Sequence, residues 1–597
     1  MKNRFCLALL LCLGAAAAHA ADEFDGSFGS GGKVTTDFFQ NNADEGTALA
    51  VASDGSVFVA GNSSQCGTTH FALAKYLPNG QLDTAFNGKT EDHPCAVDVG
   101  SSELKGGTEA AFTSSYFEKV YGVGLQADGK ILVVGSMGTN INTPKTFLAA
   151  VRFCADGKLD KAGSCGTGFG PNHDGHFSLS YDSSEAKAVA FQSDGKAVLT
   201  GHINSSLAGV PNAGQGGEDI LVVRLKTDGT LDAGFGNSGI ALVSTSDPGY
   251  LEDYGNAVAV DGADRVYVAG KTSMANGFGF ALARLSKDGQ LDKCFGDTPA
   301  CAAGGFLKIK VVDGNMDEAL GLLVEPDGNV FASGTSLHGD QGENEDVAMA
   351  RVDKDGKPDA GFGNGGTLMI DMGPAGSYAI MRGAARQPNG KYLLAGHIEA
   401  NNARDFTLLR ACANGHLDDG TAAGCGATEF GVKGVLRVAF PGYVSGEAQG
   451  VAIDPSGDVV AAGSEYATTP GPNGNQDFAV VRLKAEGGGG GTSSTTGGST
   501  TGGGSSGGTG PGKSPANDQE GPKTTDDPSG EAATTPGGPT FLNGGGCGCR
   551  VDAGSSGDDH QGVLMLAMLG LTLGVFRLVI PTRSSRAASR RYRRRRG

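Results

Sequence analysis

The sequence contains no tryptophan, and aromatic residues make up only 7% of its 597 positions. Ligand sites are commonly lined by aromatic side chains, because these rings offer large apolar contact surfaces. A sugar-binding site in this chain would therefore have to rely on Tyr and Phe. The absence of tryptophan weakens a lectin function without excluding it.

A basic surface is also missing. The formal net charge of −18 becomes −28 once ten cations near the two ends are set aside, namely Lys2, Arg4 and the eight arginines of residues 583–597. Nucleic-acid binding depends on clustered Lys and Arg that neutralise phosphates. The sequence therefore predicts no nucleic-acid partner.

The sequence lacks the signatures of common enzymes as well. It has no GxSxG motif, phosphate-binding loop or dinucleotide fingerprint in a strand–helix context. The loop Asn172–His176 has the spacing HxxH, but it lacks the glutamate and the helix of the zinc proteases. No catalytic residue and no cofactor are predicted.

A repeat of sixty-odd residues fills most of the chain. Its clearest marker is LDxxFGxxG, as at Leu231–Gly239. The Phe of this marker recurs as Phe28, Phe86, Phe169, Phe235, Phe295, Phe362 and Phe430. The Asp recurs as Asp25, Asp83, Asp160, Asp232, Asp292, Asp359 and Asp418. A second marker, an apolar run ending in glycine, falls at Gly61, Gly135, Gly201, Gly270, Gly334, Gly396 and Gly463.

Each repeat is expected to form four antiparallel strands. The segment Ala257–Gly270 contains two β-rich runs joined by a Gly/Asp turn, which suits a tight hairpin because Gly and Asp tolerate positive φ. Phe71–Tyr76 is typical of the third strand, and Lys33–Phe38 of the fourth. The third strand ends in a repeated cation, at Lys75, Arg152, Arg224, Arg284, Arg351, Arg410 and Arg482.

The two ends of the repeat region are complementary halves. Phe24–Phe38 is a back half without a front half, and Ser456–Lys484 is a front half without a back half. We expect the strand Val34–Phe38 to pair with Phe478–Leu483, which would close a ring and hide two sheet edges. The predicted fold is an all-β, seven-bladed β-propeller over residues 22–485. An open β-solenoid would explain the period but not the split ends.

The repeat resembles a known family. The pattern at Asp194–Gly239 and Asp327–Gly366 resembles the delta-60 repeat family of bacterial surface and secreted proteins, and the resemblance covers about Phe24–Lys484. That family is defined by its repeat and not by a reaction. The resemblance therefore implies no catalytic residues.

The repeated residues are expected to be structural. The Asp can cap a turn or pair with the repeated cation, and the Phe can fill the core between blades. One carboxylate per repeat is a poor calcium site, since calcium takes six to eight oxygens. The densest acidic loop could hold calcium or be a solvated loop, and its candidate ligands are Asp340, Glu343, Glu345 and Asp346.

The cysteines of the repeat region indicate disulfides. Eight cysteines fall two to a blade in four predicted blades, an even set that in an exported chain favours disulfide bonds. We expect the pairs Cys66–Cys95, Cys154–Cys165, Cys294–Cys301 and Cys412–Cys425. Metal binding is disfavoured because no pair has CxxC spacing.

The two ends of the chain predict export and anchoring. Residues 1–20 have the charged start, apolar middle and small-residue cleavage site of a signal peptide, cut after Ala20. Residues 486–546 are rich in Gly, Ser, Thr and Pro and are expected to form a disordered stalk. A cysteine motif and spacer follow at 547–561, then a predicted transmembrane helix at 562–581 and an Arg-rich tail at 582–597, which the positive-inside rule keeps cytoplasmic.

The C-terminal segment resembles a sorting tag. Gly544–Arg596, with Cys547, Cys549, an apolar run and clustered arginines, resembles the myxobacterial tag called MYXO-CTERM. The resemblance implies cleavage near the cysteines by a sorting protease and transfer to the cell surface. A plain C-terminal transmembrane anchor is the alternative.

These observations favour a surface-displayed, non-catalytic propeller that serves binding, adhesion or scaffolding. Its partner would be a protein or polysaccharide at the cell surface. One alternative is an extracellular hydrolase or lyase with an active site on an axial rim, and another is a purely structural envelope protein. Two histidines, His202 and His397, each follow the marker glycine of their repeat and could face the same rim.

Overall fold

The computed structural model describes residues 23–486, apart from residues 38–42, 66–67, 87–105, 113–114, 116, 140–144, 208–209, 211–216, 248, 297–300, 302–303, 339–343, 374–376, 401–402, 422–424, 426–427 and 468–475. The described residues form 28 β-strands, and none of their helices is long and apolar enough to cross a membrane. The predicted signal peptide, nearly all of the stalk, the cysteine motif, the apolar segment and the tail lie outside the described residues.

The strands follow one another without intervening helices in the described chain. They are β1 (Lys33–Thr36), β2 (Asp44–Val51), β3 (Val57–Gln65), β4 (Thr68–Tyr76), β5 (Gly107–Ala110), β6 (Phe117–Leu125), β7 (Ile131–Gly138), β8 (Thr146–Phe153), β9 (His176–Ser178), β10 (Ser184–Phe191), β11 (Ala197–Asn204), β12 (Glu218–Leu225), β13 (Ile240–Val243), β14 (Asp253–Val260), β15 (Val266–Met274), β16 (Gly277–Leu285), β17 (Phe306–Ile309), β18 (Met316–Val324), β19 (Val330–His338), β20 (Asn344–Val352), β21 (Thr367–Ile370), β22 (Tyr378–Arg386), β23 (Tyr392–Ala400), β24 (Ala403–Ala411), β25 (Val435–Val438), β26 (Tyr443–Ile453), β27 (Val459–Ala467) and β28 (Gln476–Leu483).

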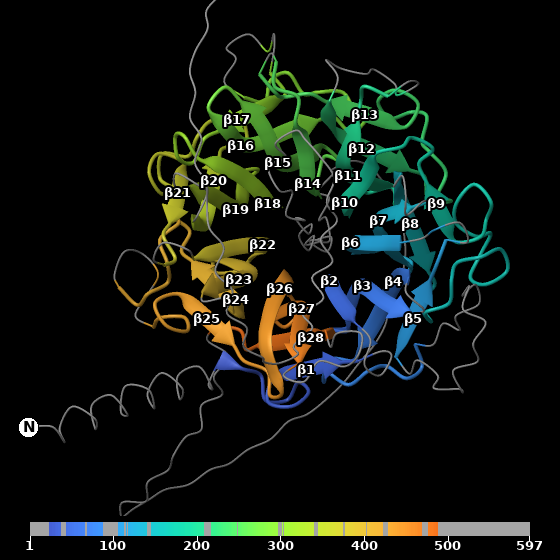
Figure 1. The fold of residues 1–597 in the computed structure, drawn as a ribbon, viewed down its shortest axis with the longest axis horizontal. Helices are drawn as coiled ribbons and strands as arrows, with labels where there is room; N and C mark the ends of the chain where they lie inside the picture. Colours follow the sequence, from blue (N-terminus) through green and yellow to red (C-terminus); the bar gives the residue numbers. More distant parts are fainter. Residues whose placement is uncertain are drawn as a thin grey trace, which may run out of the picture. The chain divides into compact units, whose positions relative to one another are not determined.

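Consecutive strands associate in antiparallel groups of four (Figure 1). The groups are β2–β5, β6–β9, β10–β13, β14–β17, β18–β21 and β22–β25, and β26–β28 are joined by β1. The first strand of each group lies nearest a common axis, and the last lies at the periphery. The predicted all-β class, with propeller-like four-stranded repeats, is therefore confirmed.

The two ends of the repeat region meet in one sheet. β1 pairs with β28 in the register Lys33↔Val481 to Thr36↔Phe478, as expected from the complementary half-repeats. The backbone N–H of Asp25 also donates to the carbonyl of Arg482 at 2.9 Å. The last sheet is thus completed by the N-terminal segment, and its peripheral edge is covered.

Apolar cores lie between neighbouring sheets. One core combines Leu132 and Leu148 of one group with Leu199 and Leu221 of the next, all at most 1% exposed. The repeated Phe residues belong to these cores and are 0–3% exposed. Phe169 packs against Gly229 of the following repeat, where an added Cβ would come within 2.4 Å of the ring. Gly229 has φ of 82°, so glycine suits both the turn and the close approach.

Each repeated Asp pairs with the repeated cation of its own repeat. The Arg152–Asp160 and Arg284–Asp292 pairs, for example, have N–O distances of 2.7 and 2.8 Å. The remaining pairs are Lys75–Asp83, Arg224–Asp232, Arg351–Asp359, Arg410–Asp418 and Arg482–Asp25. Arg152 also donates to the carbonyl of Thr227 in the next repeat, at 2.5 Å. We call this Asp–cation pair, with its Phe, the clasp.

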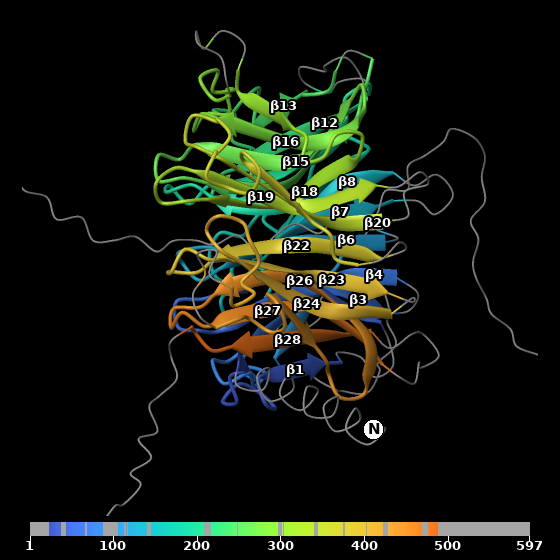
Figure 2. The ribbon, with the colours of Figure 1, turned by 90° about the vertical axis from the view of Figure 1, so that its left-hand side faces the viewer.

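Within each antiparallel group, successive connections between strands lie alternately at one end of the sheet and at the other. The described residues therefore form two distinct rims (Figure 2). The regular rim carries the Asp-Gly type turns between first and second strands and the LDxxFGxxG segments between third and fourth strands. The variable rim carries the connections between second and third strands and those from one group to the next. The latter differ in length and sequence from repeat to repeat.

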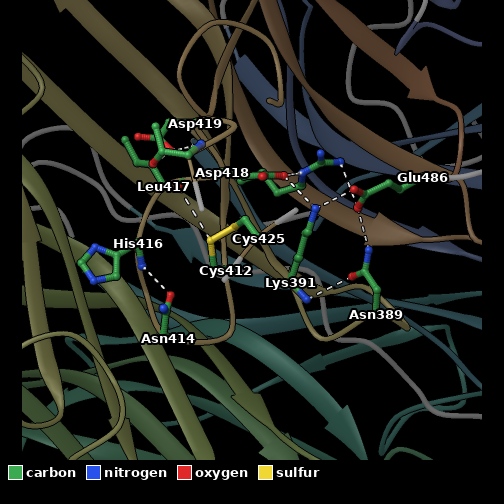
Figure 3. The surroundings of a disulfide bond; sticks show 12 residues. Asn389, Lys391, Cys412, Asn414, His416, Leu417, Asp418, Asp419, Cys425 and Glu486 are labelled. Atoms are coloured by element: carbon green, nitrogen blue, oxygen red, sulfur yellow. Dashed lines mark hydrogen bonds and ion pairs between the residues drawn. A yellow bond between two sulfur atoms is a disulfide. The ribbon is translucent and has the colours of Figure 1, made fainter. Parts of the chain in front are cut away.

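Three cysteine pairs lie at disulfide-bonding distance on the regular rim. They are Cys154–Cys165, Cys294–Cys301 and Cys412–Cys425, with Cα–Cα distances of 6.0, 4.3 and 5.3 Å. Figure 3 shows Cys412–Cys425 beside the Asp418 carboxylate, which accepts a hydrogen bond from Lys391. The expected Cys66–Cys95 pair lies outside the described residues.

Candidate functional site

The strands nearest the axis carry mostly polar side chains, in a combination that differs from repeat to repeat. A residue near the start of each first strand sits directly opposite the residue that follows the marker glycine on the second strand. These cross-strand pairs are Glu45↔Asn62, Lys119↔Ser136, Glu185↔His202, Tyr254↔Lys271, Glu318↔Thr335, Ile380↔His397 and Glu447↔Ser464. Both positions lie toward the variable rim.

A β-bulge interrupts each first strand two residues further on. The bulged residues are Thr47, Tyr121, Lys187, Asn256, Leu320, Arg382 and Gln449. Bulges change the direction of a side chain and are common beside functional sites. We call the cross-strand pairs together with the bulged residues the axial cluster.

One half of the axial cluster joins the groups β10–β13 and β14–β17. The Lys187 ammonium donates to the Glu185 carboxylate at 2.5 Å and lies 3.6 Å from the centroid of the Tyr121 ring. The His202 and Tyr254 rings are in edge-to-face contact with centroids 4.7 Å apart. Residues of adjacent groups are therefore in direct contact near the axis.

The charges in this half fix the protonation states of Glu185 and His202. Burial opposes ionisation of Glu185, but Lys187 and then His202 outweigh it and lower the pKa of its carboxyl to about 2. Burial, assisted by Lys187, lowers the pKa of His202 to about 4. At neutral pH Glu185 is therefore ionised and His202 is a neutral imidazole.

The other half of the axial cluster is centred on Glu447, which is 4% exposed. Its carboxylate lies 3.2 Å from His397 Nδ1 and 3.3 Å from Arg404 Nη1. Gln449 donates to the second carboxylate oxygen at 2.7 Å. Burial would raise the pKa of Glu447, but His397 and the neighbouring arginines lower it to about 2.

At the variable rim, the junction between β10–β13 and β14–β17 combines acidic and apolar groups. Burial raises the pKa of Glu218 to about 7, although Asn204 donates to its carboxylate at 3.2 Å. The Glu218 backbone N–H donates to the carbonyl of Leu251 at 2.8 Å. The neighbouring Tyr250 and Leu251 are 42% and 43% exposed.

The acidic loop predicted from the sequence is only partly described. Asp340 and Glu343 lie outside the described residues, whereas Glu345 and Asp346 begin β20. Asp346 is buried, lies 2.6 Å from His338 Nε2 and accepts from the backbone N–H of Met372 at 3.0 Å. These contacts give Asp346 the structural role of capping the segment after β21.

Another acidic group, which the sequence did not indicate, has its carboxylates within reach of one ion. Asp37, Asp44 and Asp477 each offer an oxygen within 4.8 Å of the others. They come from opposite ends of the chain, so no local spacing could reveal them. With one oxygen from each carboxylate, these residues supply three of the six to eight oxygens that calcium takes.

Sequence reasoning found only His202 and His397 of the axial cluster. Both follow the marker glycine, and both lie toward the variable rim, but in groups separated along the chain. His202 contacts Tyr254, whereas His397 contacts Glu447. Comparing the residue after the marker glycine across all repeats would have revealed the second-strand members of the cluster, since this position varies while the glycine before it recurs.

Comparison with known families now identifies the repeat. Six segments match the model of a family described as a domain of unknown function (DUF5122) beta-propeller, at residues 52–86, 126–162, 192–235, 264–295, 325–362 and 387–420. The chain carries DUF5122 β-propeller repeats. Most matched segments run from the hairpin turn between first and second strands to the clasp Phe. The DUF5122 match thus includes the connections between second and third strands, whereas the connections from one group to the next, also on the variable rim, fall outside it.

No curated protein matches the chain. Among solved structures, a glucose dehydrogenase is 13% identical with a TM-score of 0.31, covering 61% of this chain and 96% of its own. The polysaccharide lyase Uly1 is 10% identical with a TM-score of 0.38, covering 73% and 89%. Sqt1 from Chaetomium thermophilum is 12% identical with a TM-score of 0.32, covering 75% and 98%. Because the identities and TM-scores are this low, these structures say nothing about the function of the chain.

Proposed function

We propose that this chain is a surface-displayed, non-catalytic binding module whose ligand sits over the axial cluster at the variable rim. The observation that supports it is the contrast between the two rims. The clasp repeats the same Asp, cation and Phe around the regular rim, as expected for residues that only hold the fold. The axial cluster offers a different combination of side chains in every repeat, as expected for an asymmetric ligand.

The proposal includes a closed ring of seven blades. The pairing of β1 with β28 supports this closure, because the peripheral strand of the last sheet comes from the N-terminal end of the repeat region. A closed ring would hold the axial residues of all blades in fixed positions. Binding by pre-positioned side chains costs less ordering entropy than binding by a flexible loop.

Display at the cell surface is the other part of the proposal. It rests on the signal peptide of residues 1–20, the stalk of residues 486–546 and the resemblance of Gly544–Arg596 to a sorting tag. In this view a sorting protease processes the tag, and the stalk holds the propeller away from the envelope. The partner is a protein or polysaccharide at the cell surface.

Binding of the exported protein to its own cells tests the proposal. Protein purified as the cells export it should bind deletion-strain cells or their extracellular matrix saturably. Lys119→Ala and Glu318→Ala together should weaken this binding, whereas Asp355→Ala on the regular rim should not. No saturable binding would favour the purely structural alternative.

A hydrolase or lyase acting at the same rim is the second candidate. The observation that favours it is the presence, on the neighbouring strands β11 and β12, of a neutral histidine, His202, and a carboxyl whose pKa burial raises to about 7, Glu218. General acid–base catalysis uses groups with such separated pKa values. Turnover of a cell-surface polysaccharide that Glu218→Gln abolishes, with binding retained, would establish it.

A further inference from the structure

An apolar ledge borders the axial cluster at the variable rim. Tyr250 and Leu251 precede β14, and Leu207 follows β11 on the neighbouring group. They are 42%, 43% and 37% exposed, which makes them three of the few large apolar side chains exposed in the described residues. Sugars present flat apolar faces to such surfaces, and a tyrosine ring adds little conformational entropy cost on binding.

The ledge continues into the axial cluster along one side of a β-ladder. Tyr254 pairs with Lys271. Further toward the rim, Ser273 and Glu252 exchange backbone and side-chain hydrogen bonds, and the Tyr250 hydroxyl donates to Ala275 at 3.4 Å. Glu252, which directly precedes β14, and Tyr254 within it are two residues apart and so lie on the same side of the strand. Tyr250 and Leu251 directly precede them along the chain.

A buried cation closes the inner end of this surface. Lys271 is only 8% exposed, and its ammonium lies 4.5 Å from the Tyr254 ring centroid and 4.8 Å from that of Phe278. The two rings are the contacts that the ammonium makes in the described part of the chain, and no ion pair with a carboxylate is found there. The Nζ atom is not among the fully buried polar atoms without a hydrogen-bond partner, so a ligand can reach it. An anionic group of a ligand can therefore pair with it.

Four acidic groups act on Tyr254, the ring that Lys271 contacts, but none of them forms an ion pair with Lys271 among the described residues. Glu185 is already paired with Lys187, and Glu318 accepts from Asn256 Nδ2 at 2.9 Å. Glu218 is held by Asn204. Glu252, which is exposed, is free to accept hydrogen bonds from sugar hydroxyls.

We propose that this surface binds an anionic saccharide. Tyr250 and Leu251 cover the apolar face of a sugar ring, Glu252 accepts from its hydroxyls, and Lys271 pairs with a carboxylate or sulfate group on an adjoining ring. The inference rests on the proposed binding function and deepens it by naming the ligand class. Because the chain is strongly acidic, general attraction of polyanions would not mimic such a site.

The exported protein is titrated with three probes of similar length: oligogalacturonate, which carries carboxylates, sulfated dextran oligomers, and neutral dextran oligomers. We expect binding of at least one anionic probe and none of the neutral one.

Lys271→Met should weaken binding of the anionic probe by about tenfold or more, since a charge-assisted pair is lost. Tyr250→Ala should weaken it by about fivefold or more, through loss of the stacking surface. Far-ultraviolet circular dichroism and melting curves verify that both variants remain folded.

The matched control is Lys145→Met, an exposed lysine of the same rim that pairs with Asp182 and lies outside the cluster. Equal losses in Lys145→Met and Lys271→Met, or binding of neutral dextran as tight as that of the anionic probes, would overturn the inference. Failure of all three probes would also overturn it. The binding function itself would survive that last result if saturable, Lys119- and Glu318-dependent binding to cells persisted.

Discussion

At the scale of single residues, the axial cluster combines side chains whose charges depend on one another. Glu447 is ionised because His397, Arg382 and Arg404 surround it, and burial alone would keep it neutral. His202 is neutral because burial and two lysines oppose its protonation. Because each charge depends on its neighbours, the effect of a single substitution on stability can be predicted.

Glu447→Gln should destabilise the fold in a pH-dependent way. The pKa of Glu447 is lowered from 4.5 to about 2, so its ion pairs stabilise the folded chain fully above pH 4.5 and are lost as the pH falls through 2. We expect a loss of about 3 kcal/mol or more in the free energy of unfolding at pH 7. The difference from wild type should shrink as the pH falls below 4.5, as measured by urea denaturation.

Glu399→Gln is the control, because Glu399 also pairs with Arg404, at 2.9 Å, but is partly exposed. Its loss should be about 1 kcal/mol or less. If Glu447→Gln cost no more than Glu399→Gln at pH 7, the charge network around Glu447 would be assigned wrongly.

At the scale of elements, the clasp joins each sheet to the next, and at Arg482 it also joins the two ends of the chain. Arg482 pairs with Asp25 and donates to the carbonyl of Pro78 at 2.6 Å. Arg224 makes the same contacts within continuous chain, with Asp232 and the carbonyl of Lys287. The two arginines therefore make equivalent contacts, but only those of Arg482 join the two ends of the repeat region.

Arg482→Met should loosen β1 selectively. Without its clasp, the four-residue strand β1 has only its ladder with β28 and a few neighbouring hydrogen bonds to hold it. Amide hydrogen exchange of Lys33–Thr36 should become at least about tenfold faster, the equivalent of about 1.4 kcal/mol in local opening. Arg224→Met should leave exchange in β1 unchanged. Equal acceleration in both variants would mean that the clasp acts globally and has no special part in closure.

The fold was predictable because its determinants repeat. The marker glycine, the Asp-Gly turn and the Asp–cation–Phe clasp recur often enough to define four strands per repeat, and the half-repeats at the ends predicted the β1–β28 pairing. The axial cluster was not predictable in the same way. Its residues, such as Lys119 and Tyr254, share no motif, and only the sheet register brings them together. Asp37, Asp44 and Asp477 meet for the same reason, from opposite ends of the chain.

At the scale of the whole molecule, the proposed function requires that the chain be processed and displayed. We expect the exported protein to lack the segment beyond the cysteine motif. The double substitution Cys547→Ser and Cys549→Ser should retain that segment, while Ser556→Ala in the spacer should be processed normally. Intact-mass measurement of surface-released protein distinguishes these forms. A full-length wild-type protein in the membrane fraction would instead indicate a plain transmembrane anchor.

The central claim is that the ligand sits at the variable rim. The most direct measurement places a photo-reactive residue at Tyr250 on the variable rim or at Asp355 on the regular rim, and irradiates the protein on living cells. We predict a defined adduct from position 250, competed by unlabelled wild-type protein, and none from position 355. Adducts from position 355 alone, or equally from both positions, would contradict it.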